Sequence, residues 1–438
     1  MIRQFNSQIM ITLRTTLLLL FVSLYSGFAF AIQDHLTEKQ KEINRLDRCD
    51  KHTNHTYQVF VPSVDLSCKS MPLMVVIDPH GDGKLAIKQF KEAAQNYAVV
   101  LIASNLVKNN VTDYLQLLDE MVADTKSKYP VGNILYLGGF SGGARMSLDY
   151  AMSRHSNGVI ACGALAAPEQ IKAINCPVIA IVGMDDFNFI ESAQYIINPN
   201  SIPQNLSIET TNASHAWPES GLLADATGYL RLSTGENNTC IDRNSLLKSY
   251  VAEQTARLNS YSQSKDELNA VLLARNLSIS KTFESLGSFH SRYEKLVTQE
   301  AFVQQRDNLV KNLRLELSMR DQYEKALQKE DAVWWKNEIV VLNAKLTTEK
   351  DQQRNLVYHR IKSFLGVACY SICNRAASQK EVAVLEQIVP VYRLLEPDNP
   401  DQLYYSAVLA HLKKNLASEK YYLGKAKEKG YQGSLSIP

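Results

Sequence analysis

The stretch YLGGFSGGARMS, residues 136–147, decides how this sequence is interpreted, because Ser141 stands there between two pairs of glycines. An apolar, strand-like run precedes the glycines, and residues 144–154 follow with the spacing of a helix. Gly139, Ser141 and Gly143 therefore match G-x-S-x-G between a predicted strand and a predicted helix, the context in which this motif presents a nucleophilic serine. A tight turn without any chemical role is the alternative that the stretch alone leaves open.

The residues from about Thr56 to Thr210 alternate short β-rich runs with helical segments. The runs are YQVFV (57–61), LMVVID (73–78), VVLIAS (99–104), NILYLGG (133–139), GVIACGAL (158–165), VIAIVG (178–183) and LSIET (206–210). Several of them are continuously apolar, as strands buried on both faces are. With helical segments such as 112–129 between them, the runs predict a mostly parallel, doubly wound sheet that binds ligands at the carboxyl ends of its strands.

A base and an acid that suit a serine nucleophile follow later predicted strands. A serine hydroxyl needs a histidine to take its proton and a carboxylate to orient that histidine. His215, in SHAW after the last strand, is the predicted base. Asp186 is the predicted acid because it lies three residues beyond Gly183, where the preceding strand ends; Asp185 remains the alternative.

Backbone amides that could hold an oxyanion are expected at two turns. The amide of Gly142 follows the nucleophile and opens a helix. The turn HGDG (80–83), after the strand LMVVID, is expected to supply the second amide, from Asp82 or alternatively from Gly81. We expect His80 to orient this turn rather than to transfer protons.

Two aromatic residues are candidates for the wall of the substrate pocket. Phe140 lies inside the nucleophile motif, and Trp217 lies two residues after His215. Packing of the histidine loop is the alternative role for Trp217.

Residues 56–232 resemble the α/β-hydrolases, and more closely the secreted polysaccharide-esterase and polyhydroxybutyrate-depolymerase-like branch. The motifs that carry the resemblance are DPHGDG (78–83), IASN (102–105), GFSGGARM (139–146), GMDDFN (183–188) and SHAWP (214–218). The resemblance implies Ser141, Asp186 and His215 as a catalytic triad, Asp82 and Gly142 at the oxyanion hole, and hydrolysis of carboxylic esters through an acyl-enzyme.

The chain departs from that branch in two ways. The last two predicted strands leave no room between them for a long lid, and the binding modules typical of secreted depolymerases are absent. These departures leave a polymeric substrate open.

After about Thr239 the sequence becomes rich in Lys, Glu, Gln and Leu, with apolar residues at helical spacing. Two rows of such residues are Leu309, Leu313 and Leu317, and Phe289, Tyr293 and Leu296. An all-α helical domain of antiparallel helices is therefore expected to follow the α/β-hydrolase domain.

The end of the chain resembles a tetratricopeptide-type helical hairpin. Small residues at Ala407, Ala410 and Ala426 would let two helices pack closely. A plain helical bundle is the alternative. Such a hairpin suggests a protein partner for the helical region, and a structural appendage is the other interpretation.

The N-terminus has the pattern of a secretory signal peptide over residues 1–31. Arg3 and Arg14 lie around its start, LLLLFVSLY (17–25) is the apolar run, and Ala29-Phe30-Ala31 is an A-x-A cleavage pattern. We therefore expect an exported, periplasmic or extracellular protein without a transmembrane anchor after cleavage. An uncleaved anchor is the alternative, although the run is short for a membrane span.

The chain is thus predicted to have four parts: a signal peptide over 1–31, a catalytic domain over 32–239, a helical domain over 240–380 and a tetratricopeptide-like hairpin region over 381–438. Seven cysteines are few for an exported chain of 438 residues. Cys49 and Cys68 lie close enough in the sequence to form a disulfide, and Cys162 is expected as an inert core residue.

Composition excludes several classes of function. A formal net charge of +2 gives no nucleic-acid footprint. No Cys/His cluster has the spacing of a zinc site, so neither a metal nor a cofactor is expected.

The sequence therefore predicts a secreted or periplasmic serine hydrolase that cleaves carboxylic esters. Acetyl, feruloyl and hydroxyalkanoate esters are not distinguished, so polysaccharide-linked and polyester substrates stay open. A serine peptidase of the same fold, or a catalytically idle binding protein acting through its helices, are the alternatives.

Overall fold

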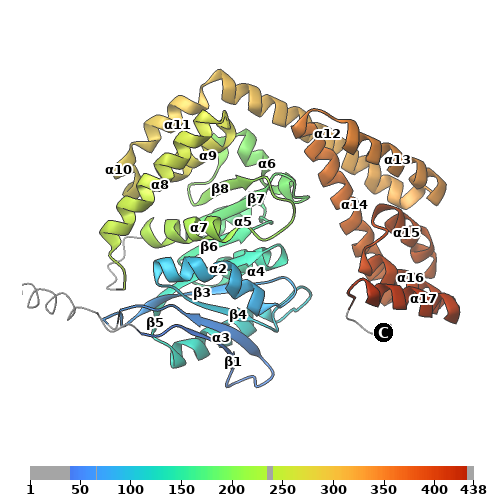
Figure 1. Ribbon diagram of the computed structural model, residues 1–438, viewed down its shortest axis with the longest axis horizontal. Coiled ribbons are helices and arrows are strands. Elements are labelled where there is room, and N and C mark those ends of the chain that lie inside the picture. Colours follow the sequence, from blue (N-terminus) through green and yellow to red (C-terminus); the bar gives the residue numbers. More distant parts are fainter. Residues whose placement is uncertain (1–39, 66, 234–239, 432–438) are drawn as a thin grey trace, which may run out of the picture.

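The computed structural model describes residues 40–65, 67–233 and 240–431 (Figure 1). The predicted signal peptide lies outside these described residues. Figure 1 shows a sheet flanked by helices, and a long arm of helices that leads away from it and turns back beside it.

Eight strands form one sheet in the order β1-β2-β4-β3-β5-β6-β7-β8. Its strands are β1 (Ile43–Arg48), β2 (Thr56–Val61), β3 (Met71–Ile77), β4 (Val100–Ser104), β5 (Val131–Phe140), β6 (Gly158–Cys162), β7 (Val178–Gly183) and β8 (Leu206–Thr211). β2 pairs antiparallel with β1 and with β4, and all other neighbours are parallel. The chain has the α/β-hydrolase fold.

All seven predicted runs form strands, and the predicted mostly parallel sheet is confirmed. Every residue of β3, β4, β6 and β7 is buried, as expected for strands covered on both faces. The sequence prediction missed β1, the edge strand INRLDR, because its side chains are largely exposed and charged. Such an edge strand shows no apolar run or alternation.

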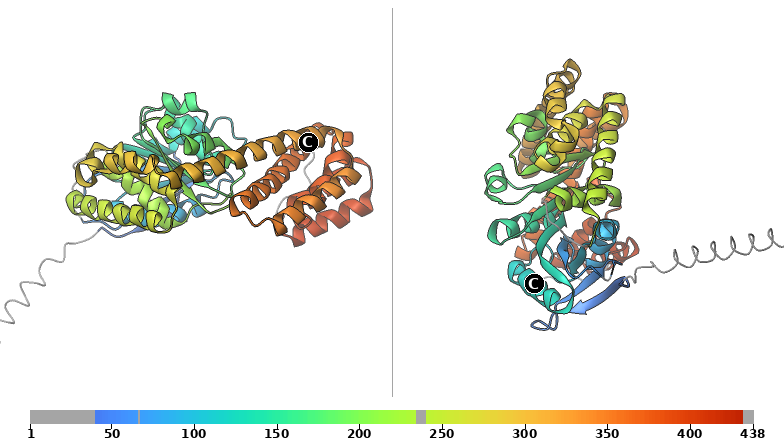
Figure 2. Two further views of the ribbon diagram at one scale, coloured as in Figure 1. Left: turned by 90° about the horizontal axis from the view of Figure 1, so that it is seen from above. Right: turned by 90° about the vertical axis from the view of Figure 1, so that its left-hand side faces the viewer.

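Helices cover both sides of the sheet (Figure 2). They are α2 (Gly83–Tyr97), α3 (Tyr114–Lys128), α4 (Gly142–Ser153), α5 (Pro168–Ala173), α6 (Phe189–Ile197) and α7 (Ser220–Ser233), with the 3-10 turn η1 (Pro199–Ser201). β7 and β8 are joined only by α6 and η1, so no long lid is inserted there.

Ten further helices of the described residues form the rest of the chain. They are α8 (Arg243–Gln263), α9 (Glu267–Ser278), α10 (Lys281–Gly287), α11 (Phe289–Val297), α12 (Glu300–Lys329), α13 (Ala332–Thr348), α14 (Gln352–Gln379), α15 (Val382–Leu395), α16 (Pro400–Leu412) and α17 (Leu416–Glu428). The predicted all-helical character of this region is confirmed. None of the helices in the described ranges is both long and apolar enough to cross a membrane.

The chain has two apolar cores, and the boundary between them does not coincide with the change in composition near Thr239. The core of the sheet continues through α8–α11 as far as Leu309 in α12. A second core begins at Met319 in the same helix and extends through α13–α16 to Val408. The 30-residue helix α12 therefore contributes to both cores.

The predicted row of leucines on α12 is only partly buried. Leu309 is buried and Leu313 half-buried, but Leu317 is 49% exposed. Each i, i+4 step overshoots a full helical turn by about 40°, so the row rotates away from the core. Asn312 and Glu316 occupy the buried face instead, at 1% and 0% exposure.

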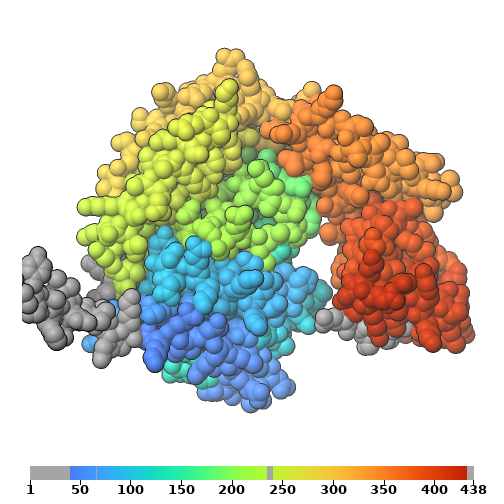
Figure 3. Space-filling model, viewed as in Figure 1, coloured from blue at the N-terminus to red at the C-terminus, as the bar shows by residue number. Residues whose placement is uncertain are grey.

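The last two helices, α16 and α17, pack against each other with Ala407 and Ala426 fully buried. This hairpin occupies the position where the sequence suggests a tetratricopeptide-like unit, and that relation stays a prediction. In the space-filling view a hollow lies between α15–α17 and the sheet with its flanking helices (Figure 3).

A bridge between Cys49 and Cys68, which the sequence allows, does not form. Cys68 forms a disulfide with Cys240, 172 residues further along the chain, while Cys49 is buried as a free thiol near His55. Cys240 lies beside the segment before β3, and this long-range contact has no local sequence pattern. The disulfide fastens the segment before β3 to the start of residues 240–431, which are called the helical half below.

Candidate active site

Ser141 lies at the turn between β5 and α4 in a backbone conformation that side chains rarely adopt. Its φ is +52° and its ψ is −118°. This positive φ is held by the surrounding turn, in which the Ser141 amide donates to the carbonyl oxygen of Cys162 at 2.8 Å. The strained turn presents the hydroxyl at the carboxyl edge of the parallel strands.

Two glycines of the motif are required for steric reasons. A Cβ atom at Gly139 would lie 2.3 Å from the carbonyl oxygen of Gly143. A Cβ atom at Gly143 would lie 2.0 Å from the carbonyl oxygen of Ile77 at the end of β3. The turn is therefore packed so closely against the neighbouring strand that only glycine fits.

The side chains of Ser141, His215 and Asp186 form a continuous hydrogen-bonded chain. The Oγ atom of Ser141 lies 2.9 Å from Nε2 of His215. Nδ1 of the same histidine lies 2.8 and 2.9 Å from the two carboxylate oxygens of Asp186. One ring nitrogen thus faces the hydroxyl and the other faces a carboxylate.

Asp186 is 1% exposed, and its own loop holds it in place. The Asn188 amide donates to Asp186 Oδ1 at 2.8 Å, and the Asn188 side chain donates to the carbonyl oxygen of Gly163 at the same distance. These bonds fix the carboxylate toward the histidine.

Asp185 points elsewhere. Its carboxylate lies 3.9 Å from Nδ1 of His359, which belongs to α14 in the helical half. Burial raises the pKa of Asp185, and the nearby Asp186 raises it further, whereas His359 and Arg360 lower it. Of the two candidate acids, Asp186 is therefore the one that contacts the histidine.

The HGDG turn after β3 is organised by Asp78, which is 3% exposed. Its carboxylate accepts hydrogen bonds from the amides of His80 at 2.8 Å and of Asp82 at 3.3 Å. The amide of Gly81 donates to the Asp78 carbonyl oxygen at 3.1 Å. The side chain of His80 is exposed, so Asp78 rather than His80 orients the turn.

The three predicted oxyanion donors are thus placed differently. Gly142 is the first residue of α4, so its amide is among those that have no acceptor within the helix. The amides of Gly81 and Asp82 both donate within their own turn. The bond from the Asp82 amide is the longer and therefore the weaker one, so this amide can more readily donate to another acceptor instead.

Aromatic rings surround the histidine. The rings of Phe140 and Phe187 lie 4.7 and 4.4 Å from the ring of His215. Trp217 lies 5.3 Å from Phe140, and its Nε1 donates to the Asp78 carboxylate at 3.2 Å. Trp217 therefore ties the histidine loop to the HGDG turn.

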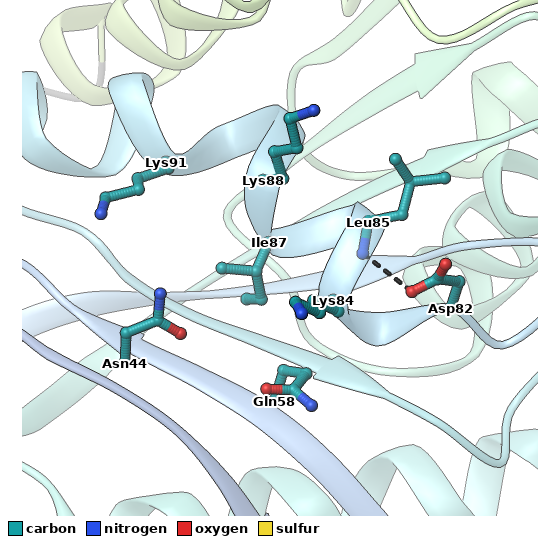
Figure 4. Close-up of a pocket in the computed structure, with 8 residues that line it drawn as sticks. All are labelled: Asn44, Gln58, Asp82, Lys84, Leu85, Ile87, Lys88 and Lys91. Atoms are coloured by element: carbon teal, nitrogen blue, oxygen red, sulfur yellow. Dashed lines mark hydrogen bonds between the residues drawn. The ribbon is translucent and has the colours of Figure 1, made fainter.

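A groove of about 450 Å³ runs along α2 (Figure 4). It is lined by Asn44, Gln58, Asp82, Lys84, Leu85, Ile87, Lys88 and Lys91. Among these only Asp82 belongs to the predicted site, and its carboxylate accepts from the Leu85 amide at 2.9 Å to cap the helix.

Within the described ranges no group of three His, Cys, Asp or Glu side chains is arranged to hold a metal ion. The free thiol of Cys162 is buried, and burial raises its pKa, as it does for Cys176, Cys369 and Cys373. Such thiols are poor nucleophiles. The nucleophile that the geometry offers is Ser141.

Sequence reasoning assigned no role to Asp78, Asn109, Phe187 or Asn188. Asp78, Phe187 and Asn188 lie within the motifs DPHGDG and GMDDFN, and for Asp78 a polar residue directly after a buried strand was the available signal. Asn109 covers Gly142, since a Cβ atom there would lie 1.8 Å from Asn109 Oδ1. It follows β4 in an exposed loop that carries no pattern.

No protein-family model and no curated protein sequence matches the chain. Solved structures do match it at low identity. A puromycin-hydrolysing peptidase from Mycobacterium tuberculosis is 11% identical over 44% of this chain, with a TM-score of 0.35; the match covers only 38% of that chain.

Two smaller proteins match over nearly their whole length. Est1E from Butyrivibrio proteoclasticus is 14% identical over 43% of this chain and 96% of its own, with a TM-score of 0.33. A lid-less α/β serine hydrolase from Xanthomonas campestris is 15% identical over 44% of this chain and 94% of its own, also with a TM-score of 0.33. These likenesses do not test the polysaccharide-esterase branch, which stays a prediction.

Proposed function

We propose that this protein is an exported serine hydrolase that cleaves carboxylic esters through an acyl-enzyme. The observation that carries the proposal is the hydrogen-bonded chain of Ser141, His215 and Asp186 on a strained turn. A polar turn with only a structural duty would need neither the positive φ at Ser141 nor a histidine aligned between hydroxyl and carboxylate.

The geometry supports a two-step mechanism. Nε2 of His215 takes the proton of Ser141 as Oγ attacks the ester carbonyl carbon, and Asp186 stabilises the imidazolium that forms. The Gly142 amide, with a second amide from the HGDG turn, donates to the tetrahedral oxyanion. His215 then returns the proton to the leaving alcohol, which leaves the acyl group on Ser141.

Water completes the cycle. His215 takes a proton from water as the water oxygen attacks the acyl carbon, and the proton passes to Ser141 Oγ as the acid product leaves. No other co-reactant is needed.

Export is part of the proposal and is supported by the disulfide between Cys68 and Cys240. Disulfides of this structural kind persist in oxidising compartments such as the periplasm and the extracellular space. The predicted signal peptide points to the same compartments.

The substrate is proposed to reach Ser141 between the catalytic edge and the helical arm. α12 and α14 contact the loop that carries Asp186. α16 brings Asp401 near His80 of the HGDG turn. Burial raises the pKa of Asp401, and the nearby His80 lowers it. The hollow in Figure 3 lies between these parts. Such an open passage would suit an extended substrate, such as an esterified polymer, better than a closed pocket would suit it.

The deciding experiment compares Ser141→Ala with Ser153→Ala on p-nitrophenyl acetate. Loss of the nucleophile is expected to lower kcat by about 10⁶-fold. Ser153 is an exposed serine at the end of the same helix, so its variant is expected to hydrolyse at the parent rate.

A fluorophosphonate probe gives an independent reading of the same proposal. It is expected to label the parent chain and Ser153→Ala but not Ser141→Ala. Hydrolysis by Ser141→Ala at the parent rate, or faster turnover of a peptide p-nitroanilide than of esters, would contradict the ester-hydrolase proposal.

A further inference from the structure

The loop that carries Asp186 is held from outside the sheet by two arginines of the helical half. This loop, residues 184–188 between β7 and α6, is called the acid loop below. Arg360 in α14 donates from Nη1 to the carbonyl oxygen of Met184 at 2.5 Å. Arg320 in α12 donates from Nη2 to the carbonyl oxygen of Phe187 at 2.6 Å. The two guanidinium groups therefore bind the backbone on both sides of Asp186.

A buried carboxylate connects the two arginines. Glu316 in α12 is 0% exposed and accepts from Nε and Nη2 of Arg360 at 2.9 and 2.6 Å. Its other oxygen accepts from Nη2 of Arg320 at 2.6 Å. Arg360, itself 1% exposed, thus uses both edges of its planar group, one toward Glu316 and one toward the acid loop.

Aromatic rings cover the same cations. The guanidinium of Arg360 lies 4.7 Å from the ring centre of Phe189, the first residue of α6, and that of Arg320 lies 4.7 Å from Phe364 in α14. Such stacking excludes water from the charges and fixes their planes. Figure 1 shows α12 and α14 meeting the sheet beside α6, where the acid loop lies.

This arrangement is costly for stability alone. Burying an ion pair carries a desolvation penalty that apolar packing at the same place would avoid. Charge-assisted bonds to two carbonyl oxygens give directional control instead, because they fix where each carbonyl and the peptide between them point. The acid loop also carries Phe187, whose ring lies 4.4 Å from that of His215. Both the acid and one neighbour of the base are therefore set by the same contacts.

We propose that Arg360 and Arg320, joined by Glu316, are positioning residues that hold Asp186 and Phe187 against His215, so that the helical half completes the catalytic centre. This inference rests on the proposed hydrolase function. It assigns the helical half a role in the reaction in addition to any partner it binds.

The test replaces each arginine by methionine, which keeps the length of the side chain and removes the charge and donors. In Arg360→Met, Glu316 stays paired with Arg320. Arg257→Met is the matched control, because Arg257 also joins the helical half to the catalytic half, through Glu209 of β8 and Asp225 of α7.

We expect Arg360→Met and Arg320→Met to lower kcat on p-nitrophenyl acetate by about 10- to 100-fold, as a displacement of catalytic groups by about 1 Å does. KM is expected to stay within about threefold, since the substrate contacts remain. Arg257→Met is expected to lower the melting temperature while kcat stays at the parent value. Equal kcat values for all three variants would overturn the inference.

A double-mutant cycle separates positioning from a general loss of structure. If Arg360 acts through Asp186, then adding Arg360→Met to Asp186→Asn is expected to lower kcat by less than about threefold. A full 10- to 100-fold further loss in that background would show that Arg360 does not act through the acid loop.

Hydrogen exchange of residues 184–188 reports on the same contacts without any reaction. Exchange there is expected to be faster in Arg360→Met and Arg320→Met than in the parent, and unchanged in Arg257→Met. If the parent proves inactive toward esters and unreactive toward the fluorophosphonate, the proposed function fails. In that case faster exchange still supports the contact as a clamp on the loop, whereas unchanged exchange overturns it.

Discussion

Asp186 in the catalytic half and Glu316 in the helical half are both fully buried carboxylates, and they are bound by different kinds of partner. Asp186 accepts from the amide of Asn188, two residues away, and faces His215. Glu316 accepts from two guanidinium groups, one of them 44 residues away. A histidine partner can gain and lose a proton at ordinary pH, and an arginine partner cannot. The first arrangement suits proton transfer, and the second suits a fixed structure.

The comparison predicts first that the two carboxylates of the acid loop differ in their effect on activity. Asp186→Asn is expected to lower kcat by about 10⁴-fold, because the amide no longer stabilises the imidazolium or selects the productive tautomer. Asp185→Asn, the matched neutralisation one residue earlier, is expected to change kcat by less than about tenfold. Steady-state kinetics on one ester measure both. A larger loss in Asp185→Asn would reverse the assignment of the acid.

Glu316→Gln tests whether the carboxylate bound by arginines is the one that stabilises the fold. It leaves the buried Arg360 and the half-buried Arg320 without their anion, and breaking a buried ion pair in this way costs about 3–5 kcal/mol. Asp186→Asn is expected to cost less than half of that free energy, since the side-chain partner of Asp186 is a histidine and not a pair of permanently charged arginines. Urea unfolding of both variants gives the two values. A cost for Glu316→Gln below about 1 kcal/mol would show that solvent reaches the cluster.

Asp185 is a third carboxylate, and its effect is expected to be the smallest. Its Oδ1 is buried without a hydrogen-bond partner among the described residues, and burial raises its pKa. A raised folded-state pKa means that the contribution of this group to stability is complete below the ordinary pKa of aspartate and is lost as pH rises through the folded value. Asp185→Asn is therefore expected to melt about 1–3 °C higher than the parent at pH 7.

At pH 4 the same difference in melting temperature is expected to be smaller, because the parent carboxyl is then more often protonated. Melting curves at the two pH values measure it. A parent more stable than Asp185→Asn at pH 7 would mean that the contact with His359 outweighs the burial of the charge.

The sheet and its candidate site could be predicted from the sequence because the patterns that indicate them span only a few neighbouring residues. A buried parallel strand is a run of apolar letters, and a nucleophile turn needs glycines at fixed offsets from Ser141. The side chains that the structure aligns come from loops directly after such strands. Sequence reasoning failed where the signal was weak, as in the exposed and charged strand β1.

The contacts that cross the molecule could not be predicted. Cys240 returns to Cys68 over 172 residues, and Arg360 reaches Met184 over 176. On α12 the leucine row misled the prediction, since the face that packs inward carries Asn312 and Glu316 where apolar residues were expected. A buried Glu on a polar helix has no local pattern that separates it from an exposed one.

Met184 and Arg360 are 176 residues apart in the sequence, so the ribosome adds them to the chain at different times. A ribosome that adds about 5–20 residues per second needs on the order of ten seconds or more to pass from the first residue to the second. For most of that interval Ser141, Asp186 and His215 have all been synthesised, but Arg360 has not. A newly made chain is therefore expected to gain its full activity late, after nearly all of it has been synthesised. If the chain is the exported hydrolase proposed above, such a delay would keep it inactive until its synthesis is almost complete.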